Sequence, residues 1–371
     1  MRILHCADIH LDSPMTTHFD AEKAKLRREE ILHTFRRMVD YAKEHKIDAI
    51  MIAGDLFDRA QVSYSIAKEV ESVINDAKDI LFFYLRGNHD HGSFESLLSQ
   101  PLRNLFTFDE NWKYYRMNQK IDGRNVIIAG VEFTNGNNAE LCQSLNLNRE
   151  DINIVMLHGQ QTESASKDRE SIDLSLLRRK GIDYLALGHV HEHSLKALDE
   201  RGVYCYPGCL EGRGFDECGV HGFEILDINV HANTNKRIRH FFVPFGKRQV
   251  QEISVDVTGA EDSFEISKRI EQTLMDQKVS SVNLISIVLT GSIPVSTKVL
   301  CDYIKKQFEH QYFAVRIKNE TAFAVNYADY EKDASFRGEY VRQVLADEGL
   351  TEAEKAELIH FGFQALGGED F

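Results

Sequence analysis

The stretch Arg86-Gly87-Asn88-His89-Asp90-His91 follows the apolar run Ile80-Leu81-Phe82-Phe83-Tyr84-Leu85. That run is short and rich in aromatic residues, and a glycine and an asparagine follow it closely, so it predicts a buried strand that ends in a loop. Gly87 permits a sharp backbone turn. Asn88 offers an amide oxygen to a hard metal ion, and His89 offers a titratable imidazole one residue later. A plain polar turn after a strand also explains this stretch when it is taken alone.

The segments that precede this stretch alternate between strand and helix patterns. Residues 1–7 and 47–53 are apolar runs that predict buried strands. Residues 21–45 and 64–78 carry apolar side chains at helical spacing. This alternation predicts crossover units and a largely parallel sheet that helices cover.

Apolar runs continue this pattern as far as residue 245. We expect strands at 126–131, 152–157, 184–187, 203–206, 222–230 and 238–245, and a short helix at 174–179. The last three strands are less interrupted by helices than the first ones, and we expect them to form a second sheet packed on the first.

A change of pattern near residues 246–248 predicts a domain boundary. We expect three parts: 1–246, a small α+β unit at 247–325, and a polar linker with two short helices at 326–371. Within the small unit the expected strands are 250–257, 284–289 and 313–318, and the expected helices are 263–276 and 297–308. The last helix of the chain opens with Thr351-Glu352-Ala353-Glu354, which is typical of a capping box.

Composition favours an ordinary globular protein of the cytoplasm. The chain has 371 residues, 43% of them hydrophobic, and no apolar run reaches the length of a membrane span. The first residues lack the hydrophobic core and cleavage site of a signal peptide. Six cysteines in a chain of this length do not make a disulfide framework. For Cys205, Cys209, Cys218 and His221 we favour buried thiols over a structural zinc site, because the spacing is not that of a common zinc module.

The net charge of −14 bears on possible partners. A nucleic-acid binder that works by charge neutralisation alone would be basic, so a polyanion would need a local cationic feature such as bound divalent metals. Basic side chains that offer a second source are Arg59, Arg86, Lys247, Arg248, Lys305 and Lys306. For any one of these, an ordinary solvated surface charge is the simpler interpretation.

Polar side chains follow five of the expected strands at the point where each strand ends. They are Asp8 and His10, Asp55, Asn88 and His89, His158, and His189 and His191. Ligands of open α/β sheets collect at the carboxyl ends of strands, so loops there bring distant residues together. Seven candidate ligands with one shared carboxylate suit two metal ions, and mixed O and N donors without thiolate favour catalytic Mn, Fe or Zn. Each feature alone also fits a polar loop, but five at successive strand ends argue against coincidence.

The order of these motifs resembles the calcineurin-like metallophosphoesterase superfamily over residues 1–245. The motifs are Asp8-x-His10, Gly54-Asp55, Gly87-Asn88-His89-Asp90, His158 and Gly188-His189-x-His191. Within that superfamily, residues 5–11 and 54–58 resemble the SbcD-type DNA-repair exonucleases. Residues 206–215 resemble the "PGS" segment of that group, with Cys209 in place of the usual serine. Asp12 follows Leu11 where members of the group usually have glycine. The unit at 249–325 is similar in place and layout to the capping domain of that group.

The resemblance implies an α/β fold, namely a metallophosphoesterase β-sandwich with flanking helices plus a small α+β capping domain. It also implies a two-metal DNA nuclease of DNA repair, an exonuclease with single-strand endonuclease activity as a second mode, that uses two divalent ions, here expected to be Mn²⁺. Asp8, His10 and His191 would hold the first ion, and Asn88, His158 and His189 the second. Asp55 would bridge both, and His89 would not be a ligand but would assist the leaving group as the catalytic residue. The implied partners are DNA and an SbcC-type coiled-coil ATPase, a homodimer is compatible with the resemblance, and no membrane is implied.

Several alternatives stay open at the level of sequence. The same metal core would serve a phosphoesterase of nucleotides or other small esters, and a non-catalytic DNA-binding scaffold is a third class that the complete ligand set argues against. Asp90 either orients His89 or is a solvated loop carboxylate, and His91 is expected in the loop without a ligand role. The helices of residues 326–371 either dock on the partner or pack on their own domain.

Overall fold

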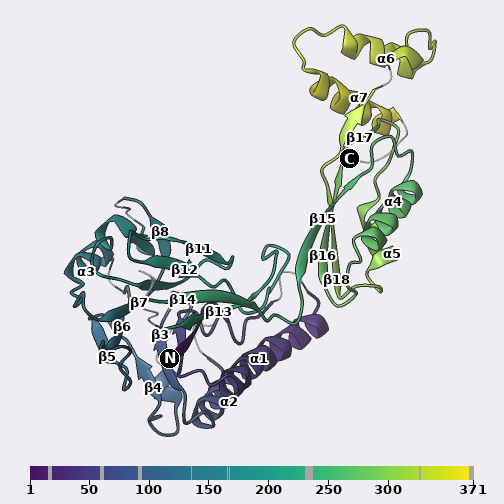
Figure 1. The fold of residues 1–371 in the computed structure, drawn as a ribbon. Coiled ribbons are helices and arrows are strands. Elements are labelled where there is room, and N and C mark those ends of the chain that lie inside the picture. Colours follow the sequence, from purple (N-terminus) through teal and green to yellow (C-terminus); the bar gives the residue numbers. More distant parts are fainter. Residues whose placement is uncertain are drawn as a thin grey trace. The chain divides into compact units, whose positions relative to one another are not determined.

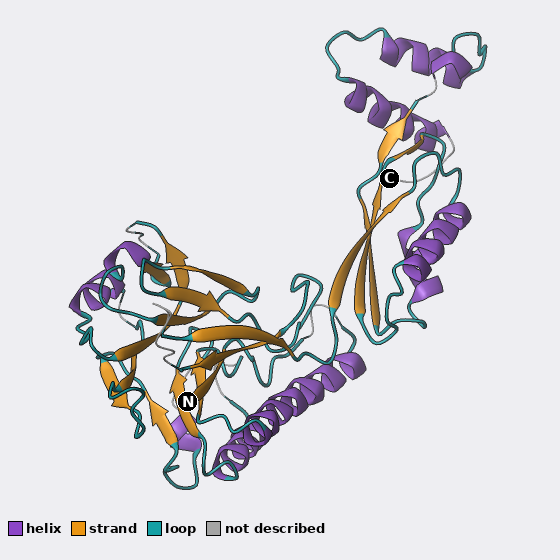
Figure 2. Ribbon diagram, viewed as in Figure 1, coloured by secondary structure: helices purple, strands orange, loops and turns teal. Residues whose placement is uncertain are grey.

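The computed structural model describes residues 1–15, 19–58, 62–90, 94–134, 136–164, 166, 168–229, 237–325 and 327–366. The chain forms two compact units, Met1–Gln249 and Val250–Phe371. Figure 1 labels the helices and strands of both units, and Figure 2 colours them by type.

The first unit contains a six-stranded sheet with the order β14-β13-β1-β2-β3-β4. Its strands are β1 (Arg2–Cys6), β2 (Ala49–Ala53), β3 (Leu81–Leu85), β4 (Leu105–Thr107), β13 (Gly222–Asp227) and β14 (Arg239–Pro244). β1 to β4 pair in parallel, whereas β13 joins both β1 and β14 in antiparallel pairs. Helices α1 (Ala21–Glu44) and α2 (Tyr64–Asn75) connect the parallel strands, as the alternating pattern predicted.

A second six-stranded sheet has the order β11-β12-β10-β7-β6-β5. Its strands are β5 (Lys113–Arg116), β6 (Val126–Gly130), β7 (Ile152–His158), β10 (Tyr184–Gly188), β11 (Ser194–Ala197) and β12 (Val203–Tyr206). The four central strands are parallel, and both edge strands are antiparallel. Shorter elements lie between the strands: η1 (Phe94–Leu97), α3 (Asn138–Ser144), β8 (Gln160–Thr162), β9 (Ser171–Asp173) and the 3₁₀ turn η2 (Leu174–Leu176).

The two sheets pack face to face as a β-sandwich. Alternate residues of each strand point inward, so Ile3, Met51 and Phe83 of the first sheet share one core with Ile154 and Ala186 of the second. A separate apolar cluster covers the outer face of the second sheet. The predicted sandwich with flanking helices is therefore confirmed.

The expected make-up of the second sheet is wrong. Of the three late strands, only β12 joins that sheet, whereas β13 and β14 extend the first sheet from the free edge of β1. An unpaired strand edge is a template for further pairing, and β13 satisfies the one that β1 would otherwise expose. Apolar pattern alone does not specify which edge a strand joins.

The second unit has a parallel sheet of three strands in the order β15-β16-β18. These are β15 (Val250–Asp256), β16 (Leu284–Thr290) and β18 (Ala314–Asn319), with helices α4 (Ser263–Asp276) and α5 (Cys301–Phe308) between them and a small pair of β17 (Ser292–Pro294) and β19 (Ala322–Ala324). α5 begins four residues later than the expected Thr297. The Thr297 hydroxyl donates to the carbonyl of Ala260 (3.0 Å), so this segment packs against the turn before α4.

The terminal helices α6 (Phe336–Leu345) and α7 (Glu352–Leu366) follow the 3₁₀ turn η3 (Tyr327–Asp329). Val341 of α6 and Ile359 of α7 share an apolar cluster with Val295, so the buried faces of both helices pack within their own unit. The predicted capping box is confirmed, because the N–H of Glu354 donates to Thr351 Oγ1 (3.3 Å) and the N–H of Thr351 to Glu354 Oε2 (2.8 Å).

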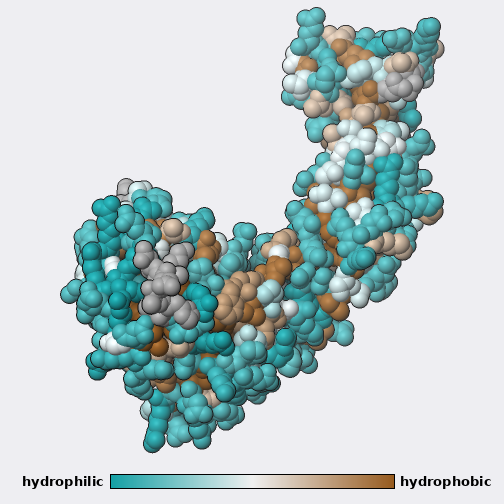
Figure 3. Space-filling model, viewed as in Figure 1, coloured by the Kyte–Doolittle hydropathy of each residue, from teal (hydrophilic) through white to brown (hydrophobic). Residues whose placement is uncertain are grey.

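In the part of the chain that the structure describes, no helix combines the length and apolar character needed to cross a membrane. Most of the surface visible in Figure 3 is hydrophilic.

Candidate metal centre

All seven predicted ligands lie at the carboxyl ends of strands, and both sheets contribute. Asp8 and His10 follow β1, Asp55 follows β2, Asn88 follows β3, His158 ends β7, and His189 and His191 follow β10. The structure brings these side chains together across the sandwich, and their role as metal ligands stays a prediction.

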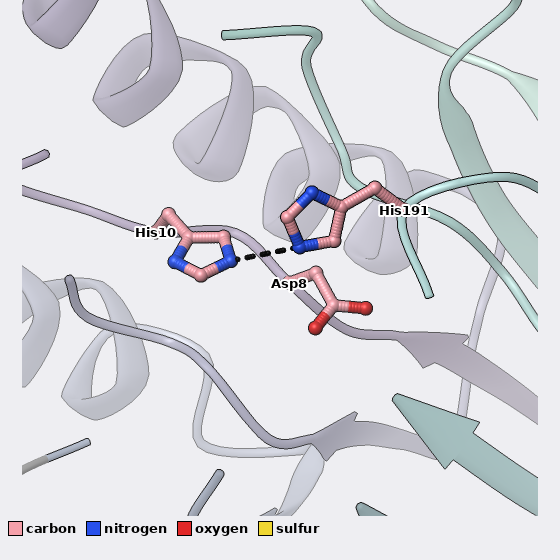
Figure 4. Close-up of side chains that lie close together, drawn as sticks. All are labelled: Asp8, His10 and His191. Carbon is pink, nitrogen blue, oxygen red and sulfur yellow. Dashed lines mark hydrogen bonds between the residues drawn. The ribbon is translucent and has the colours of Figure 1, made fainter. Parts of the chain in front are cut away.

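The first group consists of Asp8, His10 and His191 (Figure 4), which offer ligand atoms within 4.8 Å of one another. His10 Nε2 and His191 Nε2 face each other at 3.2 Å. The backbone N–H of His189 donates to Asp8 Oδ1 (2.9 Å) and holds that carboxylate in place. Two imidazole nitrogens aimed at one point beside a carboxylate form a donor set for a cation.

The second group consists of Asn88, His158 and His189. The amide oxygen of Asn88 lies 2.9 Å from His158 Nε2 and 3.4 Å from His189 Nδ1. Asp55 lies between the groups, with Oδ2 at 3.7 Å from His10 Nε2 and 3.4 Å from His158 Nε2. One carboxylate therefore faces both groups, which is the arrangement that a bridging ligand requires.

Side chains that sequence reasoning missed orient these imidazoles. Glu217 Oε1 lies 2.7 Å from His191 Nδ1, and Asp58 Oδ1 lies 3.4 Å from His10 Nδ1. Hydrogen-bonded partners of this kind fix the ring so that its other nitrogen is presented to a metal. Asp58 is part of the quoted motif at 54–58. Its position three residues after Asp55 does not predict that it contacts His10 and His89 in the fold.

His89 lies beside the two groups with its side chain 48% exposed, and its Nδ1 is 2.7 Å from Asp58 Oδ1. The hydrogen bond to Asp58 raises the pKa of His89, so the imidazolium is favoured. This position suits a proton donor at the open side of the site.

Both interpretations of Asp90 are wrong. Its carboxylate is buried and accepts from the backbone N–H of Phe57 (2.8 Å), Gly87 (3.0 Å) and Leu56 (3.2 Å). Asp90 thus ties the two loops that carry Asp55 and Asn88, and burial raises its pKa to about 7. His91 and Arg59 lie outside the described residues.

The backbone of the site is strained. Asp8, His10, Asp55 and His189 have positive φ angles of 51°, 50°, 52° and 102°. Residues other than glycine rarely adopt this region, and such conformations cluster at functional sites. The neighbouring Gly87 is required for a different reason, because a Cβ there would collide with the Asp55 side chain.

The pKa values of neighbouring side chains in the candidate centre are shifted in opposite directions. Burial raises the pKa of Asp8 to about 6 and lowers that of His10 to about 4. Burial opposes the charged form of Asp55 as well, but the hydrogen bond and charge of His158 hold the pKa of Asp55 below its usual range. The same pairing raises the pKa of His158 to about 9 against the effect of burial. A buried anionic Asp55 among imidazoles fits a cation, so the residues present suit the implied metal ions.

A pocket of about 140 Å³ adjoins Asn88 and His158. Arg86, Arg169 and Phe133 also line it.

Several cations expected to be solvated surface charges are paired instead. Arg86 Nε donates to Glu132 (2.9 Å), and Lys247 and Arg248 both bond Glu30 (2.7 and 2.6 Å).

The cysteine expectation holds in part. Cys205 and Cys209 are buried as expected, whereas Cys218 is exposed, which corrects the prediction for that residue. Cys209 Sγ lies 3.2 Å from His221 Nδ1.

Comparison with known proteins gives consistent results. A family model of calcineurin-like phosphoesterases matches residues 1–193. The uncharacterized metallophosphoesterase YhaO of Bacillus subtilis is 26% identical over 302 residues, which are 79% of this chain and 72% of that protein. The DNA double-strand break repair protein Mre11 of Methanopyrus kandleri is 25% identical over 254 residues (62% of this chain, 54% of that protein). Mre11 of Sulfolobus acidocaldarius is 24% identical over 377 residues (93% and 94%).

Among solved structures, a dimetal phosphatase from Danio rerio aligns with a TM-score of 0.42 at 13% identity, over 66% of this chain and 99% of that chain. The family model covers more than half of the 371 residues and includes every candidate ligand. The chain belongs to the calcineurin-like phosphoesterases, a family of metal-dependent phosphoester hydrolases.

Proposed function

We propose that this protein is a two-metal-dependent DNA nuclease of DNA repair. It hydrolyses phosphodiester bonds as an exonuclease, with cleavage of single strands as a second mode to be tested. The observation that carries the proposal is the convergence of six further O and N donor side chains around Asp55. The DNA substrate is supported by relatives named Mre11, one of which matches 93% of this chain.

Asp8, His10 and His191 would hold one ion, Asn88, His158 and His189 the other, and Asp55 both. When bound, two divalent ions lower the pKa of water and neutralise charge on the phosphate. We propose Mn²⁺ for both positions, because O and N donors without thiolate suit it.

His89 supplies the proton to the leaving oxygen. Its partner Asp58 favours the imidazolium and fixes the ring, and about half of the side chain is exposed, so that a substrate can reach it. A positioned acid whose pKa lies near neutral pH is effective in this role. Asp58 is a positioning residue, because it acts through His89 and His10.

A nuclease assay tests the proposal directly. Linear duplex DNA is incubated with the protein and Mn²⁺, with Mg²⁺, or without metal, and a phosphomonoester is assayed in parallel. We expect DNA cleavage that is fastest with Mn²⁺. Robust monoester turnover without DNA cleavage would overturn the nuclease proposal.

The substitution His89→Ala tests the proton donor. We expect loss of cleavage with the metal content unchanged, and His310→Ala is the control because its side chain is 87% exposed and distant in sequence from every candidate ligand. Loss of metal in the His89→Ala chain would show that His89 is a ligand instead.

A phosphoesterase of nucleotides or other small esters is the second candidate. The observation that favours it is the pocket of about 140 Å³ beside Asn88 and His158, which would hold a small ester between Arg169 and Phe133. The monoester arm of the assay decides between the two.

We also propose an SbcC-type coiled-coil ATPase as partner, with α6 and α7 as the docking segment, and a cytoplasmic location. The buried faces of α6 and α7 pack within their own unit. Contact with the ATPase would therefore use the exposed side chains of Phe336 (73%) and Phe361 (49%). Phe336→Asp and Phe361→Asp should weaken binding of the ATPase and leave DNA cleavage by the isolated chain unchanged. Sedimentation of the full chain tests whether it also forms a homodimer.

A further inference from the structure

A second group of metal-type donors lies away from the proposed catalytic ligands. His193, Cys205 and Glu224 each offer one ligand atom, and these atoms all lie within 4.8 Å of one another. Cys205 belongs to β12 of the second sheet and Glu224 to β13 of the first, while His193 directly precedes β11. The group therefore joins the two sheets of the sandwich.

The pleat of the strands places these side chains between the sheets. Leu226 and Cys205 are part of the core that the sheets share. Glu224 is two residues from Leu226 on the same strand, so it points to the same face. In the ladder, His5 of β1 is paired with Glu224, and His240 of β14 is paired with Leu226.

The distances suit one tetrahedral ion. Glu224 Oε2 lies 3.2 Å from His193 Nε2, and Glu224 Oε1 lies 3.5 Å from His240 Nδ1. Ligand atoms at about 2.0–2.3 Å from a tetrahedral zinc are roughly 3.3–3.8 Å apart. His240 faces the other oxygen of Glu224 and lies outside the group of three donors, so the fourth position of an ion would be left to solvent.

Burial gives an independent reason for a cation. Glu224 is 2% exposed and Cys205 is fully buried, and a carboxylate in such a place is costly without a compensating charge. His5 is also fully buried, and its Nε2 has no hydrogen-bond partner among the described residues. The side chains of His193 and His240, 30% and 21% exposed, leave the group open to solvent on one side.

We propose that His193, Cys205 and Glu224 hold a zinc ion, with water in the fourth position, and that this ion fastens the two sheets to each other. Thiolate sulfur, imidazole nitrogen and carboxylate oxygen are all zinc ligands, and a thiolate disfavours Mg²⁺ and Mn²⁺. His193 is two residues after His191, so the ion would also fix the segment that carries the proposed catalytic ligands His189 and His191. The site is separate from the two-metal centre and does not depend on its function.

Zinc content tests the site in the full chain. An Asp55→Ala chain, in which the proposed catalytic centre is disabled, is treated with chelator, dialysed against zinc and analysed by mass spectrometry. We expect about one equivalent of zinc per chain, which a further Cys205→Ser substitution removes. Cys142→Ser is the matched control, because Cys142 is equally buried but lies in the separate apolar cluster on the outer face of the second sheet.

Equal zinc content in the Cys205→Ser and Cys142→Ser chains would overturn the site. More than one equivalent of zinc in both the Cys205→Ser and the Cys142→Ser chains would mean that Asp55→Ala does not empty the catalytic centre. The difference in zinc content between these two chains then still measures the new site.

A second measurement needs no thiol variant. Cobalt(II) bound to a thiolate shows a charge-transfer band in the near ultraviolet, and we expect this band in the cobalt-loaded unmodified chain and its loss in Glu224→Gln. An unmodified chain without the band overturns the proposal even if Cys205→Ser fails to fold. If Glu224 only pairs with a protonated histidine and no metal binds there, the cobalt-treated unmodified chain shows no such band.

Discussion

Asp55 and Asp183 are buried carboxylates at opposite ends of the strands, and they have different partners. Asp55 follows β2 and faces the imidazoles of His10 and His158. Asp183 precedes β10 and accepts from the N–H of Asn153 (2.8 Å) and from Arg201 Nε and Nη2 (2.9 and 2.6 Å). At the amino end the charge is satisfied by fixed donors alone. At the carboxyl end Asp55 accepts from the N–H of His89 (2.9 Å) and also faces imidazoles that can hold a metal. The comparison separates carboxylates that stabilise the fold from carboxylates that are available for chemistry.

The backbone explains part of this difference. The first residues of a strand present N–H groups that need acceptors, and carboxylates at the amino ends provide them. Asp48 accepts from the N–H of Arg2 (2.7 Å), and Asp151 from that of Asn125 (3.2 Å). Carboxylates at the other end are held by loops whose backbone is itself strained, at Asp8 and Asp55.

The largest effect is expected for Asp55→Ala. It should remove metal and lower cleavage by about 10³-fold or more, because the substrate charge is then uncompensated. The stability of the chelated protein should fall as well, because the buried imidazole of His158 loses the carboxylate that pairs with it. Cleavage rates and metal content measure the first effect and urea unfolding the second. Retained metal would show that Asp55 is not shared between the two groups.

The same substitution at the other end, Asp183→Ala, should lower stability without removing metal. It leaves the N–H of Asn153 and the guanidinium of Arg201 without their acceptor and should lower the free energy of unfolding by about 2–3 kcal/mol. Metal content and cleavage should stay unchanged at a temperature where the chain is folded. A loss of metal comparable to that of Asp55→Ala would break the comparison.

A smaller effect is expected when a partner of a ligand is changed. Glu217→Gln should weaken metal binding about 10- to 100-fold, because Glu217 orients His191. Calorimetric titration of the chelated protein with Mn²⁺ measures the change. Glu163→Gln is the control, since Glu163 pairs with Arg178 on the surface at 62% exposure. Similar affinities in the two variants would remove Glu217 from the site.

The smallest effects concern pH and have opposite signs at the two ends. In the chelated protein, burial raises the pKa of Asp8 to about 6, so its contribution to stability is present in acid and is lost as the pH rises through that value. Burial opposes ionisation of Asp199 too, but three backbone N–H groups hold its pKa below the usual value. Its contribution is therefore present above about pH 4 and is lost in acid.

Unfolding of Asp8→Asn and Asp199→Asn across this pH range measures both signs. Relative to the unmodified chain, Asp8→Asn should gain stability as the pH rises, and Asp199→Asn should lose it. Parallel curves for the two variants would contradict the assignment.

Sequence predicted the positions of the candidate ligands well for a physical reason. Each follows an apolar run, and parallel strands bring their carboxyl ends to one edge, so the convergence of Asp8 and Asn88 in the first sheet needed no knowledge of side-chain contacts. His158 meets them from the second sheet, which only the packing of the two sheets explains. The central strands and the helices of the second unit were found for the same reason. Edge strands such as β4 and β17 have three residues each, which is too short to show a period.

Contacts between distant side chains could not be predicted. Asp58, Glu217 and the cluster around Glu224 depend on which strands are neighbours, and the pairing of β13 with β1 is not encoded in the apolar pattern of either strand. The two roles weighed for Asp90 were wrong because its partners are backbone N–H groups, which every sequence position offers equally.

The facing rings of His10 and His191 are 181 residues apart in the chain. At a synthesis rate of about 5–20 residues per second, roughly 10–40 seconds separate their appearance on the ribosome. Until His189 and His191 have been made, the emerging chain lacks the donors that complete the two proposed metal positions. Metal loading of the proposed centre therefore cannot be complete before synthesis has passed His191, and a shorter chain offers no finished site to a wrong metal.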